Sequence, residues 1–371
     1  MRVLILTIEA FGGLGGIAKY SRDLSRALIA WPGCDEVVVV PRLRRLDNEA
    51  VPDGITQDDR AIGGKFRFLV RCLRWLVFGG RFDVIVCGHL NLLPFAALWR
   101  LRLGPPVMLA FYGIDAWQPH RSALVNRLVR RAAYFLTISI VTRDRFLAWA
   151  RVDPARGFIL PPCIDIDCFG PGPKPPALVS RYGLAGKRVL LLLGRMEADE
   201  RLKGFDEMIE ALASLVADDP SLVCVFAGDG GDRDRLQRLA ERRGVAGHVV
   251  FTGMVAEAEK VDHYRLADAF VMPSRGEGFG IVLLEALACG IPVVASRLDG
   301  GAEALRDGEM GILVDPDDPE ELKKAIGEAL ARPRGVVPEG LAHFSFERFE
   351  QGLHRIFDRL SATGWRGTPK Q

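Results

Sequence analysis

The chain has 371 residues, of which 49% are hydrophobic and 26% charged, and its formal net charge is +2. This composition excludes a disordered chain, and the length predicts two domains at roughly 100–200 residues each. The near-neutral total argues against a protein that wraps nucleic acid. It hides an asymmetry, because residues 1–165 hold 23 Lys and Arg against 14 Asp and Glu, a net of +9, and the remainder has a net of −7.

Short apolar runs alternate with longer amphipathic stretches along the chain. Continuous Val, Ile and Leu runs predict buried parallel strands at 3–7, 37–40, 84–87, 107–111 and 134–138. A second series follows at 189–193, 223–226, 249–252, 269–272, 292–295 and 311–314. Helical patterns lie between the strands, as at 16–30, 204–217, 233–243 and 320–331. This alternation predicts the α/β class.

A stretch with six prolines and two glycines, residues 161–178, interrupts the series. It suits neither a helix nor a central strand, so we predict that it joins two doubly wound, Rossmann-like domains. The predicted domains are residues 1–165 and 166–345. The last segment, residues 346–371, contains an amphipathic helix with no following strand, and we expect this helix to pack on the N-terminal domain.

The first strand is followed by a glycine-rich loop in which Gly13, Gly15 and Ala18 satisfy the dinucleotide fingerprint G-x-G-x-x-G/A. Two features of the sequence argue against a dinucleotide-dependent oxidoreductase. Intervening residues loosen the turn after the strand, and the strand at 37–40 is followed by PRLRRL instead of an acidic ribose ligand. What remains is either a flexible turn or an anion site, where Gly15 and Gly16 let the backbone approach a phosphate at a helix N-terminus.

The second half combines cations with carboxylates. Arg195 follows the strand at 189–193, and Lys203 precedes the next helix, so two cations at the carboxyl end of a parallel strand suit a diphosphate. Glu277 falls in a glycine-rich loop after the strand at 269–272, and Glu285 in the second turn of the following helix. Carboxylates accept hydrogen bonds from sugar hydroxyls, so the set predicts a sugar-nucleotide site. Either glutamate alone would be an ordinary carboxylate near a helix start.

These motifs resemble the retaining glycosyltransferases of family 4. The E-x7-E string from Glu277 to Glu285 matches that family's signature, and CGIPVVA at 289–295 and DGG at 299–301 agree with it. The resemblance covers nearly the whole chain and is strongest in the second half. It implies the GT-B fold, in which two Rossmann-like domains face a central cleft.

The resemblance also implies roles. The catalytic residues would be Glu277, Arg195 and Lys203, and the donor-binding residues Gly15, Gly16, Gly194, Met254, Phe279, Gly280 and Glu285. The cations would neutralise the donor diphosphate, Glu277 would bind the transferred sugar, and Glu285 the ribose. The base would stack near Met254. The family retains anomeric configuration and needs neither metal nor cofactor, and the donor would be a UDP- or GDP-linked hexose.

Three features depart from the family pattern, namely residue 112, the long gap between Arg195 and Lys203, and the start of the linker at residue 163. Tyr112 stands where the family often has a histidine, and Gly113 and Asp115 follow it. Tyr112 and Asp115 are therefore candidates for contact with the sugar or the acceptor. For Tyr112, a hydrogen bond to substrate and simple packing are equally good interpretations.

Residues 65–81, KFRFLVRCLRWLVFGGR, interleave apolar side chains with arginines and contain no acidic residue. The pattern is typical of a helix at an anionic membrane surface, and equally of a core helix with its arginines in water. In GT-B enzymes the N-terminal domain, to which this stretch belongs, usually binds the acceptor. We therefore expect a lipid-linked or oligosaccharide acceptor in bacterial polysaccharide or glycolipid synthesis, and a cytoplasmic protein peripheral to the inner face of the plasma membrane. No nucleic acid partner is expected.

Two other functions remain as alternatives. A sugar-nucleotide epimerase or hydrolase on a similar fold would use the same donor site, and a non-catalytic sugar-nucleotide-binding protein would keep the site without the reaction. The Glu277–Glu285 string in its glycine-rich setting favours transfer. The six histidines form no metal-spaced pair.

Overall fold

The structure is a computed structural model that describes residues 1–46, 49–198 and 201–362. It divides into two compact units, one comprising Met1–Cys163 and Phe346–Gln371, the other Ile164–Ser345. The chain leaves unit 1 after Cys163, within the proline-rich stretch and two residues before the predicted boundary. The predicted terminal segment runs to residue 371, and its residues 363–371 lie outside the described part.

Unit 1 is built on a parallel sheet, which has seven strands within the described residues in the order β3-β2-β1-β4-β5-β6-β7. The strands are β1 (Arg2–Thr7), β2 (Glu36–Pro41), β3 (Ile55–Gln57), β4 (Val84–Cys87), β5 (Val107–Phe111), β6 (Tyr134–Thr137) and β7 (Gly157–Ile159). The five predicted strands are present. The edge strands β3 and β7 were not predicted, because each has three residues and no apolar run.

The helices of unit 1 alternate with these strands. They are α1 (Gly15–Ala30), α2 (Lys65–Phe78), α3 (Leu93–Leu103), α4 (Ile114–Trp117), α5 (Ala123–Val129), α6 (Ile140–Ala150) and α14 (Phe346–Ala362), with short 3-10 turns at Asp59–Ala61, Leu90–Leu92 and Pro154–Arg156. Buried side chains of α2, α3, α5 and α6 share one core with alternate residues of the strands, so these helices cover one face of the sheet.

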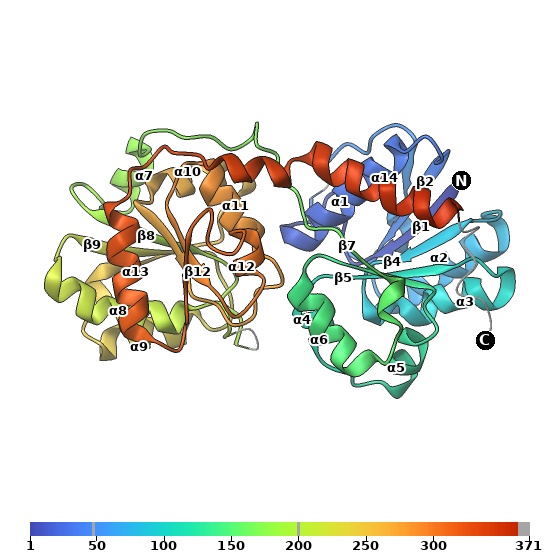
Figure 1. Cartoon of the computed structure of the whole chain (residues 1–371), viewed down its shortest axis with the longest axis horizontal. Helices are drawn as coiled ribbons and strands as arrows, with labels where there is room; N and C mark the ends of the chain where they lie inside the picture. The colour runs from blue at the N-terminus through green and yellow to red at the C-terminus, as the bar shows by residue number, and fades with distance from the viewer. Residues whose placement is uncertain (47–48, 199–200, 363–371) are drawn as a thin grey trace. The chain divides into compact units, whose positions relative to one another are not determined.

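The last helix, α14, packs against α1 at the start of the chain (Figure 1). Trp31 Nε1 donates to Asp358 Oδ1 at 2.8 Å, and His354 Nε2 lies 2.8 Å from the carbonyl oxygen of Ala27. The ring of Phe349 packs edge-on against Tyr20, with centroids 5.4 Å apart. The final helix is therefore part of the first unit's core.

Unit 2 contains a second parallel sheet, with six strands in the described part of the chain and the order β10-β9-β8-β11-β12-β13. Its strands are β8 (Arg188–Leu193), β9 (Leu222–Ala227), β10 (Val249–Gly253), β11 (Ala269–Met272), β12 (Val293–Ser296) and β13 (Ile312–Val314). Its helices are α7 (Pro176–Arg181), α8 (Phe205–Asp218), α9 (Arg233–Arg242), α10 (Lys260–Leu266), α11 (Ile281–Ala288), α12 (Gly301–Ala304) and α13 (Pro319–Ala331), with 3-10 turns at Ala246–His248, Glu257–Glu259 and Glu339–Phe344.

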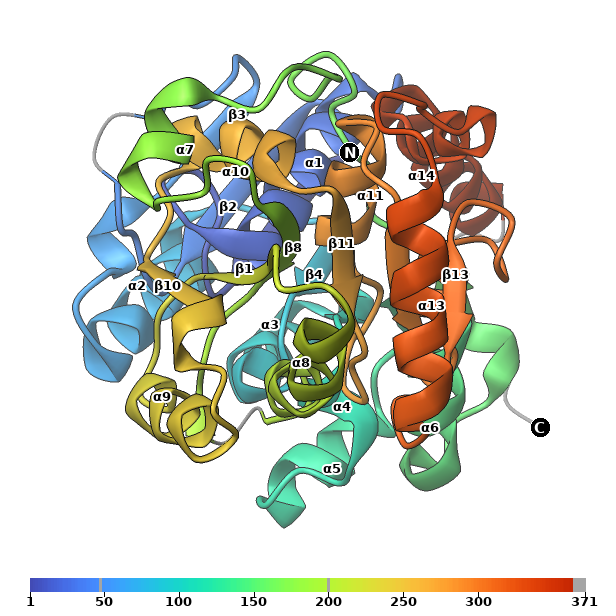
Figure 2. The same ribbon diagram turned by 90° about the vertical axis from the view of Figure 1, so that its left-hand side faces the viewer.

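Local signals explain where α13 begins in unit 2. Asp318 caps α13 by accepting from the amides of Glu320 and Glu321, and Pro319 occupies the first helical position. Helices α8 and α13 lie side by side (Figure 2) and share one core on the sheet. The fold class is therefore α/β, as predicted.

Each sheet has a point where the strand order reverses. In unit 2 it lies beside β8, which pairs with β9 on one side and β11 on the other; in unit 1 it lies beside β1, between β2 and β4. Ligands of open α/β sheets bind outside the carboxyl ends of the strands at such points, which are called switch points.

Among the described residues, no helix combines the length and apolar character needed to cross a bilayer.

Candidate functional site

The carboxyl ends of β8 and β11 bring two of the predicted residues into contact. Lys203 Nζ donates to Glu277 Oε2 at 2.6 Å, and both side chains are mostly buried. Lys203 is held there by its neighbour Gly204, which has a φ of +90° and packs against Pro273 so closely that a Cβ would lie 2.8 Å from the proline carbonyl oxygen. Glycine is therefore required at this point, and it fixes the start of α8 beside the Glu277 loop.

Arg195 is exposed in the turn that follows β8 and Gly194. This turn packs against the glycine-rich loop after β9, since a Cβ on Gly228 would lie 2.0 Å from the carbonyl oxygen of Gly194. The amide of Met196 donates to the carbonyl oxygen of Asp229 at 3.1 Å. The backbone on both sides of Arg195 is thus fixed, while its side chain reaches solvent at the edge where Lys203 lies.

The loop that carries Glu277 is shaped by Asp299, which was not among the predicted site residues. Asp299 Oδ2 accepts from the amide of Glu277 at 2.9 Å and from Ser274 Oγ at 2.7 Å, and Oδ1 accepts from the amide of Gly301 at 3.0 Å. Burial raises the pKa of Asp299 to about 6, although these hydrogen bonds lower it. The DGG string at 299–301 was a signal for this residue, but its contact with the Glu277 loop depends on tertiary structure.

Glu285 lies in α11 and is 2% exposed. Its Oε1 accepts from Lys260 Nζ at 2.7 Å, and its Oε2 accepts from the hydroxyl of Tyr264 at 2.6 Å. Burial alone would lower the pKa of Lys260, yet the carboxylates of Glu285 and Glu257 hold it above its ordinary value. Sequence reasoning missed Lys260 and Tyr264. Their i, i+4 spacing on α10 was the available signal, but nothing in it pointed to Glu285.

The remaining donor-site candidates are spread over the same edge of unit 2. Gly280 caps α11 with a φ of +97°, and Phe279 is buried, with its ring centroid 5.4 Å from that of Phe344. Met254 follows β10 and is 76% exposed. The carbonyl oxygen of Gly253 accepts from the amide of Gly228 at 3.0 Å, which joins the ends of β9 and β10. The large apolar side chain of Met254 is therefore exposed to solvent at this edge of the sheet.

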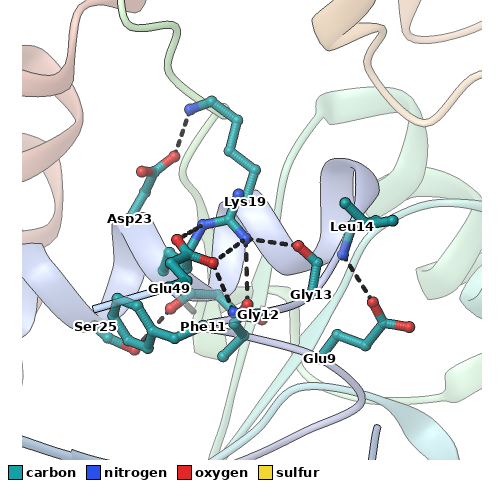
Figure 3. Close-up of polar contacts among 12 residues, drawn as sticks. Glu9, Phe11, Gly12, Gly13, Leu14, Lys19, Asp23, Ser25 and Glu49 are labelled. Atoms are coloured by element: carbon teal, nitrogen blue, oxygen red, sulfur yellow. Dashed lines mark hydrogen bonds and ion pairs between the residues drawn. The ribbon is translucent and has the colours of Figure 1, made fainter. Parts of the chain in front are cut away.

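In unit 1, two carboxylates hold the glycine-rich loop (Figure 3). Glu49 Oε2 accepts from the amide of Gly12 at 2.6 Å, and Glu9 Oε2 accepts from the amide of Leu14 at 3.0 Å. Gly15 and Gly16 begin α1 and are exposed; Gly15 has a φ of +81°, and a Cβ built on it would meet nothing within 4 Å. The first helical amides are therefore presented in an open turn that suits an anion.

Tyr112 and Asp115 lie at the carboxyl end of β5. The amide of Tyr112 donates to Asp115 Oδ1 at 3.2 Å, and the ring of Tyr112 packs edge-on against Tyr20 with centroids 5.3 Å apart. Asp115 Oδ2 is buried and has no hydrogen-bond partner among the described residues. Burial raises the pKa of Asp115 to about 7. Tyr112 is half-buried and packs against Tyr20, next to a carboxyl group whose second oxygen has no hydrogen-bond partner in the described part of the chain.

The described residues contain no group of three or more His, Cys, Asp or Glu side chains that could hold a metal ion. The arrangement offers cations and helix N-termini for phosphate, and carboxylates for hydroxyl groups.

Two family profiles match the chain. The family described as Glycosyl transferases group 1 matches residues 181–339, and Glycosyltransferase Family 4 matches residues 14–168. A GDP-mannose-dependent alpha-(1-6)-phosphatidylinositol monomannoside mannosyltransferase of Mycobacterium tuberculosis is 36% identical over 367 residues, which cover 92% of this chain and 92% of that protein.

Other relatives align over shorter regions. The Mycolicibacterium smegmatis protein of the same name is 38% identical over 240 residues, 62% of each chain. A D-inositol 3-phosphate glycosyltransferase of Geodermatophilus obscurus is 37% identical over 234 residues, 58% of this chain and 51% of that protein. The chain thus spans less than two thirds of the length of these two relatives.

Solved structures share the fold at low identity. Sucrose-phosphate synthase of Thermosynechococcus elongatus has a TM-score of 0.77 at 20% identity, covering 98% of this chain and 100% of that one. The Anabaena protein HepE, solved in complex with UDP-glucose, has a TM-score of 0.76 at 20% identity, covering 97% of this chain and 100% of that one. These similarities show the GT-B fold.

Proposed function

Because the chain belongs to glycosyltransferase family 4, we propose that it transfers a hexosyl group from a nucleoside-diphosphate sugar to a hydroxyl group of a lipid-linked or oligosaccharide acceptor. The observation that carries the proposal is the contact of Lys203 with Glu277 at the switch point of unit 2. A cation for phosphate and a carboxylate for sugar hydroxyls, side by side, match the junction between the diphosphate and the hexose of such a donor.

In this proposal Lys203 and Arg195 neutralise the diphosphate, together with the amides around Gly194 and the start of α8. Glu277 is the present counter-ion of Lys203, so it compensates the lysine charge while no phosphate is bound. A diphosphate would take over that role and release Glu277 to accept hydrogen bonds from sugar hydroxyls. The amides of Phe279 and Gly280 are assigned to the same sugar.

We assign Glu285 to the ribose. A carboxylate offers about four acceptor positions, and Lys260 and Tyr264 occupy two of those on Glu285. The base would lie against the exposed side chain of Met254. The amides of Gly15 and Gly16 in unit 1 are assigned to an anionic group of a substrate, and Asp115 with Tyr112 to contact with the sugar or the acceptor.

For the reaction we propose retention by a same-face displacement. The bond between the anomeric carbon and the phosphate oxygen breaks, the acceptor oxygen bonds to that carbon, and the acceptor proton passes to the departing phosphate oxygen. Arg195 and Lys203 would stabilise the charge that develops on the phosphate, which is the task of a metal ion in other transferases. Neither a metal nor a cofactor is required by this scheme.

The names of the relatives favour particular substrates. Those covering most of this chain are GDP-mannose-dependent and act on a phosphatidylinositol monomannoside. They support GDP over UDP in the donor, and a lipid-linked acceptor. We propose that the transfer takes place at the cytoplasmic face of a membrane.

The test is Glu277→Ala in the full chain, with Glu241→Gln on the exposed side of α9 as the matched control. Transfer from a panel of GDP- and UDP-linked hexoses should fall by at least about 100-fold, while binding of the free nucleoside diphosphate persists. Unchanged transfer by Glu277→Ala would refute the site. Release of free sugar at the same rate with and without acceptor would assign the chain to hydrolysis.

A further inference from the structure

Helix α2 has a buried apolar face and an exposed apolar face. One face is buried in the core of unit 1 and consists of Phe68, Cys72 and Leu76. The other is open to solvent and consists of Phe66, Val70, Leu73 and Val77, which are 77%, 40%, 40% and 48% exposed. The exposed positions are spaced i, i+4, i+7 and i+11, which places them within about 60° of the helix circumference at 3.6 residues per turn. We call these four side chains the outer stripe.

The rotation of α2 about its own axis is fixed by a buried carboxylate. Asp58 is 3% exposed, and its Oδ2 accepts from Trp75 Nε1 at 2.7 Å and from Arg71 Nε at 2.8 Å. Burial alone would raise the pKa of Asp58, but these hydrogen bonds hold it below its ordinary value. Because Arg71 and Trp75 are tied inward, the helix cannot turn the outer stripe into the core.

The surroundings of the outer stripe are cationic. Lys65, Arg67, Arg74 and Arg81 are exposed, and residues 65–81 contain no acidic residue. Phe78, at the end of the helix, is 80% exposed. An open pocket beside the stripe is lined by the apolar side chains Ile62, Phe66 and Val70, by Arg60, Arg67 and Arg71, and by Asp59. Aromatic side chains next to guanidinium groups suit the interface of a lipid bilayer, where apolar acyl chains meet anionic head groups.

We propose that the outer stripe and Phe78 insert into the interface of an anionic lipid bilayer, with Lys65, Arg67, Arg74 and Arg81 against its phosphate groups. A second copy of the chain is a poorer occupant, because it would bring the same cations together. The inference rests on the proposed function only for the lipid nature of the acceptor. Docking itself needs neither donor nor acceptor, so the two can be tested apart.

The experiment is co-sedimentation of the full chain with vesicles of phosphatidylcholine, alone or mixed with phosphatidylglycerol. The chain should bind the mixed vesicles, bind phosphatidylcholine at least tenfold more weakly, and lose affinity as salt is raised. The double variant Phe66→Ser, Phe78→Ser should bind at least tenfold more weakly than the unchanged chain. Leu124→Ser, which alters an apolar side chain that is 57% exposed on α5, is the matched control and should bind normally.

A second pair separates charge from burial of apolar surface. Arg67→Gln with Arg74→Gln should weaken binding to the mixed vesicles, and Arg121→Gln, also exposed in unit 1, should not. Absence of binding to the mixed vesicles, or equal binding by the Phe66 and Phe78 double variant, would overturn the proposal. So would self-association of the chain that this double variant abolishes.

Activity distinguishes the two proposals. The Phe66 and Phe78 double variant should transfer sugar to a water-soluble acceptor at the normal rate, because neither residue belongs to the donor site. A chain that transfers sugar and does not dock overturns the docking surface alone. A chain that docks and transfers no sugar overturns the proposed function alone.

Discussion

Lys203 and Glu277 are partners across the carboxyl ends of β8 and β11, with Nζ and Oε2 2.6 Å apart. The two residues are 74 positions apart in the chain. Their pairing places a cation and a carboxylate side by side at a single point of unit 2, the combination that the proposed sugar-diphosphate donor would use.

Replacing Lys203 by Met should reduce transfer by at least about 100-fold, because charge that develops on the phosphate loses a stabilising cation. Affinity for the nucleoside diphosphate should fall as well, while Glu277 is left without its counter-ion. Lys324→Met, on the exposed side of α13, should change neither quantity. Steady-state kinetics and calorimetric titration measure both. Full activity of the Lys203 variant would remove this residue from the site.

The buried ion pair of Glu285 with Lys260 predicts a stability effect. Lys260→Met leaves a buried carboxylate without its cation and should lower the free energy of unfolding by about 3 kcal/mol. Tyr264→Phe removes one hydrogen bond to Glu285 and should cost about 1–3 kcal/mol. Lys323→Met, which breaks a solvent-accessible pair with Asp218, should have a much smaller effect on the free energy of unfolding. Urea unfolding followed by circular dichroism provides the comparison.

Nucleotide binding shows whether Glu285 also acts on the donor. If its carboxylate holds the ribose, Tyr264→Phe should weaken binding of the nucleoside diphosphate in addition to its effect on unfolding, because Glu285 loses the partner that orients it. Weakened stability with unchanged nucleotide affinity would restrict Glu285 to a structural role.

The raised pKa of Asp115 predicts that the free energy of unfolding depends on pH. Its folded pKa is about 7 because of burial, whereas an unfolded aspartate titrates near 3.9. The folded state therefore holds the proton more tightly, and this contribution to stability is complete below about pH 4 and is lost as pH rises through 7. At pH 8 the ionised group should cost up to about 4 kcal/mol.

Asp115→Asn removes this titration and keeps an oxygen to accept from the amide of Tyr112. The variant should be more stable than the unchanged chain at pH 8 and should lack its decline between pH 4 and 7. Thermal unfolding at a series of pH values tests this, and parallel curves for the two proteins would contradict it.

Substitution of Gly15 tests the effects of backbone strain and of ligand binding separately. Gly15→Ala should cost about 1 kcal/mol of stability, because φ is +81° while the added Cβ meets nothing within 4 Å. Gly186→Ala is the matched control, with a φ of +69° and equally open space. Both variants should lose similar stability, but only Gly15→Ala should raise the KM of a substrate whose anionic group rests on the start of α1. Equal KM values for the two variants would leave Gly15 without a binding role.

The local sequence determined much of the fold. Buried strands such as β4, β5 and β11 were predicted with their observed bounds, because a strand covered on both faces must be apolar along its whole length. The spacing of Glu277 and Glu285 likewise placed one residue in the loop after β11 and the other in α11. These features depend on near neighbours in the chain, so a pattern in a short window is sufficient to predict them.

Tertiary structure alone decided the partners. Glu285 meets Lys260 and Tyr264 because α10 packs beside α11, and α14 joins α1 although more than three hundred residues separate them. The sequence of α2 was compatible with a core helix or a membrane helix; in the fold Asp58 holds one apolar face inward, and the outer stripe stays exposed. Hydrophobicity specifies that a side chain favours burial, but packing of distant elements decides which of several apolar faces is covered.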